Sequence, residues 1–120
     1  MIHTFRLPCP PVSDNHLYPD RYGVRHLDHR AKEYRNLVAQ TVKYDGTPRV
    51  SYDAEGAYRV SIIYYWADHR RRDVSNWNKV ILDAMQGVVY KDDKQITDLK
   101  LKKRPTDKGE SFLLMEVEKL

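Results

Sequence analysis

The stretch that decides the fold is Tyr58-Arg59-Val60-Ser61-Ile62-Ile63-Tyr64-Tyr65-Trp66. Its β-branched and aromatic side chains favour a strand, and we expect that strand to be central in a sheet. Turn-forming residues at Asp53–Gly56 precede it, and a second turn is expected at Ala67–Arg72. The other elements are predicted outward from this strand.

A strand and a helix are predicted on its amino-terminal side. Ile2 to Leu7 alternates apolar and polar residues until Pro8-Cys9-Pro10-Pro11, which indicates a short strand ended by prolines. Ser13 to Arg25 shows no period and predicts an irregular, exposed loop. From Asp28, a candidate cap, a helix is expected to about Lys43, ended by Asp45-Gly46-Thr47-Pro48. Its predicted buried stripe is Ala31, Tyr34, Leu37, Val38 and Thr41 or Val42.

A second helix is predicted on the carboxyl-terminal side, from Asp73 to a stop at Gly87. A turn at Lys91–Lys94 then leads into an alternating strand that contains Ile96 and Leu99 or Leu101. Pro105–Gly109 predicts a hairpin into a last strand, Phe112–Val117. The apolar positions that recur at helical spacing in the second helix are Trp77, Val80, Ile81, Ala84 and Met85.

This order of strand, helix, strand, helix, strand, strand predicts an α+β fold with one small mixed sheet and both helices on one face. With 120 residues, 41% hydrophobic and 32% charged, the chain is expected to form one globular domain over residues 1–120. A single cysteine, Cys9, excludes an intrachain disulfide, and no apolar run has the length of a membrane span. We therefore expect a cytoplasmic protein without a membrane partner.

The positive charge is concentrated in one part of the chain. Residues 70–104 contain ten Lys and Arg against five Asp, a net charge of +5, whereas the other residues sum to −1. Such an excess is either a solvated face or a surface for a polyanion such as nucleic acid.

The same stretch contains the most organised acids. Steps of about 100° per residue place Asn76, Lys79 and Asp83 on one arc of the second helix, opposite its apolar stripe, with Asp73 at its head. Asp73 has a simple alternative role as a helix cap, and Asp92-Asp93 as a turn. However, cations flank both positions, and carboxylates among phosphate-binding cations are the combination that Mg²⁺-dependent phosphodiester cleavage requires. Those cations are Arg70, Arg71, Arg72, Lys91 and Lys94.

One family combines these features. The run Arg70-Arg71-Arg72-Asp73-Val74-Ser75-Asn76-Trp77-Asn78-Lys79, with Leu82-Asp83-Ala84 and residues 88–96 after it, resembles the RusA family of phage and bacterial Holliday junction resolvases. The opening Leu7-Pro8-Cys9-Pro10-Pro11 with Asn15 is also similar to that family's first strand and loop.

The resemblance implies a homodimeric, Mg²⁺-dependent endonuclease, with Mn²⁺ as a possible substitute and no organic cofactor, that binds four-way junctions and nicks two strands symmetrically. By position, Asp73 and Asp93 would hold the metal, Lys79 would stabilise the attacked phosphate or the leaving group, and Asn76 would orient the site. The best-known members have a third acid where this chain has Ser75, whose hydroxyl can reach a metal but adds no charge. Asp92 or Asp83 could replace that acid. The nucleic-acid-binding residues would be Arg70, Arg71, Arg72, Lys91 and Lys94.

Other interpretations stay open at this stage. The chain could be a nuclease for other branched or single-stranded DNA, or a catalytically weak junction-binding protein. A zinc site at His26, His29 and His69 is disfavoured, because no further ligands follow at a defined spacing. Tyr18, Tyr22 and Tyr90 could stack on unpaired bases, although aromatic residues more often pack in the interior.

Overall fold

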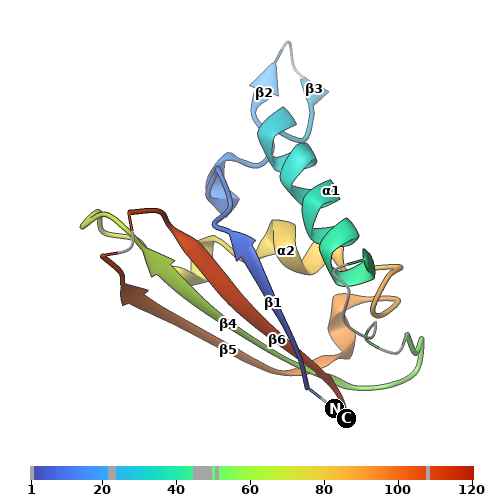
Figure 1. The fold of residues 1–120 in the computed structure, drawn as a ribbon. Helices are drawn as coiled ribbons and strands as arrows, with labels where there is room; N and C mark the ends of the chain where they lie inside the picture. Colours follow the sequence, from blue (N-terminus) through green and yellow to red (C-terminus); the bar gives the residue numbers. More distant parts are fainter. Residues whose placement is uncertain (1, 22–23, 45–49, 51, 108) are drawn as a thin grey trace.

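The computed structural model describes residues 2–21, 24–44, 50, 52–107 and 109–120 (Figure 1). The predicted order of strand, helix, strand, helix, strand, strand is confirmed, with short elements added between. The strands are β1 Ile2–Pro8, β2 Asp20–Arg21, β3 Val24–Arg25, β4 Tyr58–Trp66, β5 Ile96–Pro105 and β6 Phe112–Lys119. The helices are α1 His29–Tyr44 and α2 Lys79–Ala84, and the 3-10 turns are η1 Asp14–His16, η2 Val74–Asn76 and η3 Asp93–Gln95.

The main sheet has the strand order β1-β6-β4-β5, with β4 inside it as predicted. β6 is antiparallel to both β1 and β4, whereas β5 is parallel to β4. The predicted hairpin between β5 and β6 is therefore wrong, because these strands lie on opposite sides of β4. The connection crosses the end of β4, where the amide of Thr106 donates to the carbonyl of Trp66 at 3.2 Å.

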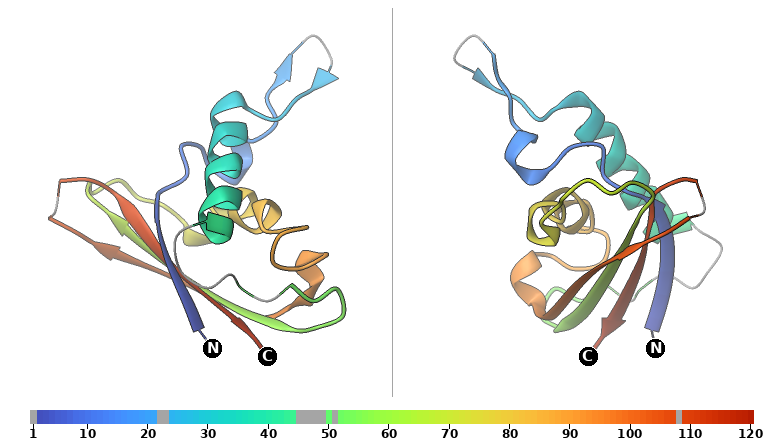
Figure 2. Two further views of the ribbon diagram at one scale, coloured as in Figure 1. Left: turned by 45° about the vertical axis from the view of Figure 1, so that its right-hand side comes forward. Right: turned by 90° about the vertical axis from the view of Figure 1, so that its left-hand side faces the viewer.

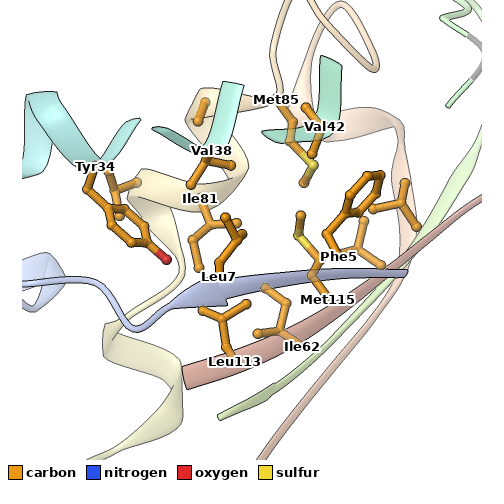
Figure 3. Packing of buried hydrophobic residues seen from close by; sticks show 14 of the residues in the cluster. Phe5, Leu7, Tyr34, Val38, Val42, Ile62, Ile81, Met85, Leu113 and Met115 are labelled. Atoms are coloured by element: carbon orange, nitrogen blue, oxygen red, sulfur yellow. The ribbon is translucent and has the colours of Figure 1, made fainter. Parts of the chain in front are cut away.

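Both helices cover the same face of this sheet, as predicted (Figures 1 and 2). Alternate residues of the strands point into the space between sheet and helices, and Figure 3 shows how they meet the helices there. The core contains Phe5 and Leu7 from β1, Ile62 from β4, and Leu113 and Met115 from β6, packed against Val38, Val42, Ile81 and Met85.

α1 begins at the predicted cap. The Oδ1 atom of Asp28 accepts hydrogen bonds from the amides of Arg30 and Ala31 at 2.8 and 3.4 Å. Leu37 was predicted to be buried but is 41% exposed. The buried stripe is narrower than expected, and α1 packs chiefly against α2 and less extensively against β1. The residues of that stripe are Ala31, Tyr34, Val38 and Val42.

The second helix is shorter than predicted. Asp73 starts the 3-10 turn η2 instead of an α-helix, and the backbone leaves helical geometry at Trp77 before α2 begins at Lys79. The buried side chain of Asn78 explains the break, since its Nδ2 donates to the carbonyl of Val74 at 2.8 Å and its Oδ1 accepts from the Tyr64 hydroxyl. The helix also ends earlier than predicted, at Ala84, and Gly87, the predicted stop, lies three residues beyond that end with a φ of 80°.

The segment predicted as an irregular, exposed loop is more ordered than expected. It contains η1 and the small β2-β3 pair, and Leu17 is only 1% exposed. The predicted break at Asp45–Pro48 and the side chain of Tyr22 lie outside the described residues. The helices that the structure describes are too short or too polar to cross a membrane.

Candidate active site

Asp73 lies at the start of η2, directly after the arginine run. Its Oδ1 accepts hydrogen bonds from the amide and the hydroxyl of Ser75, at 3.0 and 2.8 Å. These two bonds, and the positive charge of Lys103 on β5, lower the pKa of Asp73 below its ordinary value. The capping role considered for Asp73 is confirmed, on a 3-10 turn, and its exposed carboxylate is held ionised at the surface.

Asp92 and Asp93 lie at the start of η3. Asp92 forms a capping box with Gln95, because its side chain accepts from the amide of Lys94 at 2.9 Å while Gln95 accepts from the amide of Asp92 at 3.1 Å. The side-chain amide of Gln95 also donates to the carbonyls of Asp53 and Gly56, at 2.6 and 2.8 Å. The turn that carries both acids is thereby anchored to the segment that enters β4.

Lys79, at the start of α2, is a cation whose charge acts on Asp93. Its Nζ lies 3.0 Å from Asp83 Oδ2, one turn along the helix. Asp83, and more weakly Tyr18 and Asp93, raise the pKa of Lys79. Partial burial raises the pKa of Asp93 and the neighbouring Asp92 and Asp83 raise it further, whereas Lys79 opposes that shift. The charge of Lys79 therefore acts against the rise in the pKa of Asp93.

Asp14, in η1, is a member of this group that the sequence did not indicate. Its Oδ1 accepts from the backbone amide of Lys79 at 3.2 Å, so that a residue of the opening loop is bound to the first residue of α2. Partial burial raises the pKa of Asp14, and so does the charge of Asp83. The two bonded residues are 65 positions apart, and no local pattern could have paired them.

The candidate site residues thus fall into two acidic groups. Asp73 and Ser75 form one. The other contains Lys79 and the acids Asp83, Asp92 and Asp93, together with Asp14, which the sequence did not indicate. Within the described part of the chain, no hydrogen bond or ion pair joins Asp73 to Asp93. Nor do three or more His, Cys, Asp or Glu side chains of that part converge as a complete metal cage. Asn76 ends η2, where its amide donates to the carbonyl of Asp73 at 3.0 Å.

Four of the five predicted DNA-binding cations have exposed side chains: Arg70, Arg71, Lys91 and Lys94. Arg72 differs, because its side chain is only 10% exposed. It forms an ion pair with Asp68, and its guanidinium lies over the ring of Trp66. Asp68 had a sequence signal, an acid four residues before an arginine, but on a segment that was predicted as a turn.

The tyrosines considered for base stacking have different surroundings. Tyr90 is fully buried, with its hydroxyl donating to the carbonyl of Leu82 at 2.7 Å, so a stacking role for it is wrong. Its ring is part of the core, where it packs edge-on against Tyr58 with the ring centres 5.7 Å apart. Tyr18 is 39% exposed beside Lys79.

Comparison with known proteins adds independent information. A family model described as "Endodeoxyribonuclease RusA" matches residues 8–113. The "Crossover junction endodeoxyribonuclease RusA" of Escherichia coli strain K12 is 30% identical over 108 residues, which cover 89% of this chain and 87% of the relative. The protein of the same description from Enterobacteria phage 82 is 31% identical over 104 residues, covering 86% and 83%. A third relative, from Shigella sonnei, is 29% identical over 108 residues.

Proposed function

Because the chain belongs to the RusA family of endodeoxyribonucleases, we propose that it is a Mg²⁺-dependent endonuclease that resolves four-way DNA junctions by paired, symmetric nicks. The observation that carries this proposal is the family match over residues 8–113, which includes every residue of both acidic groups. The relatives are described as crossover junction endodeoxyribonucleases, and we extend that substrate to this chain.

The donor chemistry fits a hard divalent cation. Burial and the neighbouring acids Asp92 and Asp83 raise the pKa of Asp93, and a bound cation would oppose that shift. Mg²⁺ needs only one or two protein carboxylates besides water and phosphate oxygens, so a complete protein cage is not required. We assign Asp73 and Asp93 as its ligands, one from each acidic group, with Ser75 and Asp92 as further oxygen donors. When bound, Mg²⁺ or Mn²⁺ lowers the pKa of a water and neutralises charge on the scissile phosphate.

The chain's own side chains have separate roles in this proposal. Asp83 raises the pKa of Lys79, and we assign this cation to the negative charge that develops on the phosphate or the leaving oxygen. Ser75 orients the Asp73 carboxylate through its hydroxyl. Asp14 fixes the start of α2, and therefore the backbone from which the Lys79 side chain extends. Asn76 belongs to the same turn as Asp73 and orients the site from there.

The DNA backbone is assigned to the exposed cations. Arg70 and Arg71 precede Asp73, and Lys91 and Lys94 surround Asp92 and Asp93, so that phosphate-binding charge flanks each acidic pair. Such contacts give salt-dependent affinity that does not depend on base sequence.

A homodimer completes the proposal. A four-way junction with two-fold symmetry presents two equivalent strands, and one chain carries one such set of acids. Paired cuts therefore require two copies related by the same symmetry.

The second candidate is a junction-binding protein with weak catalysis, which the serine at position 75 favours because a carboxylate is missing there. Incubation with a labelled four-way junction, a matched duplex and the single strands, with and without Mg²⁺, separates the two functions. The nuclease cuts only the junction, and only with the metal. Binding to the junction without cutting in either Mg²⁺ or Mn²⁺ would establish the second candidate instead.

A further inference from the structure

Both terminal nitrogens of the Arg72 guanidinium are hydrogen-bonded within the protein. Nη1 and Nη2 donate to the two carboxylate oxygens of Asp68, at 2.5 and 3.0 Å, in the fork geometry that arginine forms with carboxylates. Oδ1 of Asp68 also accepts from the amide of Arg70 at 3.0 Å. The pair of terminal donors that would form a fork with a phosphate is therefore turned toward the chain's own acid.

Two tryptophans enclose the same guanidinium. The carbon Cζ of Arg72 lies 3.9 Å from the ring centre of Trp66 and 5.8 Å from that of Trp77. The two indoles pack edge to face, with centres 5.2 Å apart. Trp66 is the last residue of β4, and Trp77 lies just before α2. Arg72 thus connects the sheet to the helix that carries Lys79, by stacking as well as by charge.

The backbone on either side is tied to the sheet. The amide of Ala67 donates to the hydroxyl of Ser111 at 2.9 Å, where the crossing connection passes. At the other end, Nζ of Lys103 on β5 donates to the carbonyl of Arg72 at 2.6 Å, directly before Asp73. The segment from Ala67 to Arg72 is therefore held at its beginning, at its end and, through Asp68, across its middle.

From these contacts we propose that Arg72 is a positioning residue and not a DNA contact. Together with Asp68, Trp66 and Trp77, a set named here the arginine clamp, it fixes the segment that presents Asp73 to the metal and Arg70 and Arg71 to the DNA. This inference rests on the proposed function, and it gives Arg72 a different role from the two arginines before it.

The two roles make opposite predictions for Asp68. If Arg72 contacted phosphate, Asp68→Asn would release a cation and tighten DNA binding. If Arg72 holds the segment, Asp68→Asn breaks the same clamp from the other side and resembles the loss of Arg72. Arg72→Lys separates the roles a second time, because lysine keeps the charge but cannot form the fork or stack in the same way.

The test compares Asp68→Asn, Arg72→Gln, Arg72→Lys and their parent, with the exposed neighbour Arg71→Gln as the matched control. Single-turnover cleavage of a four-way junction at saturating protein and Mg²⁺ should slow about tenfold or more in all three clamp variants. Losses of this size are typical when a residue that orients a metal ligand is removed. The double variant Asp68→Asn with Arg72→Gln should be no slower than either single variant.

Two further measurements, of junction binding and of tryptophan fluorescence, do not require the protein to cut DNA. Junction binding measured in Ca²⁺ across salt concentrations should keep its parental slope in Arg72→Gln, whereas Arg71→Gln should lose about one unit of slope. The chain has two tryptophans, both in the clamp, so their emission should shift to longer wavelength in the three clamp variants and stay unchanged in Arg71→Gln.

Three results would overturn the clamp: tighter binding by Asp68→Asn, parental cleavage by Arg72→Lys, or a shallower salt slope in Arg72→Gln like that of Arg71→Gln. If the parent neither binds nor cuts branched DNA, the proposed function fails. The clamp is then decided by tryptophan emission, and parental emission in Asp68→Asn and Arg72→Gln refutes it.

Discussion

Asp73 and Asp93 have opposite pKa shifts although the same role is proposed for both. Hydrogen bonds from Ser75 lower the pKa of Asp73, whereas burial and neighbouring acids raise that of Asp93. The ionised form of Asp73, which a cation would bind, is therefore stabilised by Ser75, and a cation near Asp93 would offset the repulsion from the acids beside it.

Asp73→Asn and Asp93→Asn should each reduce single-turnover junction cleavage by more than about 100-fold, since changes outside a metal's direct ligands already cost about 10- to 100-fold. Junction binding in Ca²⁺ should be unchanged or tighter, because each substitution removes negative charge that faces phosphate. A variant that still cuts at the parental rate would remove that residue from the metal site.

Ser75→Asp should lower the Mg²⁺ concentration needed for half-maximal cleavage, because a third carboxylate strengthens a site for a hard cation. Ser75→Ala should raise it, since Asp73 then loses the hydroxyl that lies 2.8 Å from its Oδ1. A Mg²⁺ titration of single-turnover cleavage measures both. If neither variant moves the midpoint, Ser75 lies outside the site, and Asp92 or Asp83 becomes the better third ligand.

The Asp68–Arg72 ion pair should make stability depend on pH in the acid range. Hydrogen bonds from Arg72 and the amide of Arg70 lower the pKa of Asp68 from 3.8 to about 2. Because the pKa of Asp68 is lower in the folded than in the unfolded chain, its ionised form stabilises the fold at pH values above the unfolded pKa. This stabilisation is lost as the pH falls through the folded pKa. In thermal melts, Asp68→Asn should therefore be less stable than its parent above about pH 4, and the difference should shrink toward pH 2. A constant difference over that range would contradict this assignment.

At the scale of helices and strands, the features that were predicted correctly are those that depend on residues adjacent in sequence. β4 has its predicted bounds, and α1 begins after its predicted cap, since composition and capping are read from adjacent residues. The second helix was predicted too long because the spacing of Val80, Ile81 and Ala84 continues back to Trp77, although the backbone does not. Asn78 breaks it through a bond to Tyr64, which no local pattern reveals.

Asn78→Ala should destabilise the protein by about 1–3 kcal/mol, because the Tyr64 hydroxyl and the Val74 carbonyl both lose a hydrogen bond in a buried setting. Tyr64→Phe is the matched variant, since it removes the shared bond from the other side. Urea unfolding of the two single variants and the double variant measures their coupling. Additive costs would show that the Tyr64–Asn78 bond does not stabilise the fold.

At the scale of the whole molecule, contacts between distant segments decided what the sequence missed. The parallel pairing of β5 with β4, and the bond from Lys79 to Asp14, join residues whose own neighbourhoods give no sign of each other. Much of the candidate site could be proposed from sequence because the arginine run, Asp73 and Lys79 are close along the chain. The grouping of Asp93 with Lys79 and Asp83 was supplied by the fold.

The proposal of a dimeric resolvase is tested most directly with a supercoiled plasmid that extrudes a cruciform, a four-way junction within a closed circle. Paired nicks within one bound complex convert it directly to the linear form, and single nicks give relaxed circles. We expect linear product in Mg²⁺, none with EDTA or with Asp73→Asn, and none from a plasmid that lacks the cruciform. Relaxed circles alone, or equal cutting of the plasmid without a cruciform, would contradict junction resolution by a pair of sites.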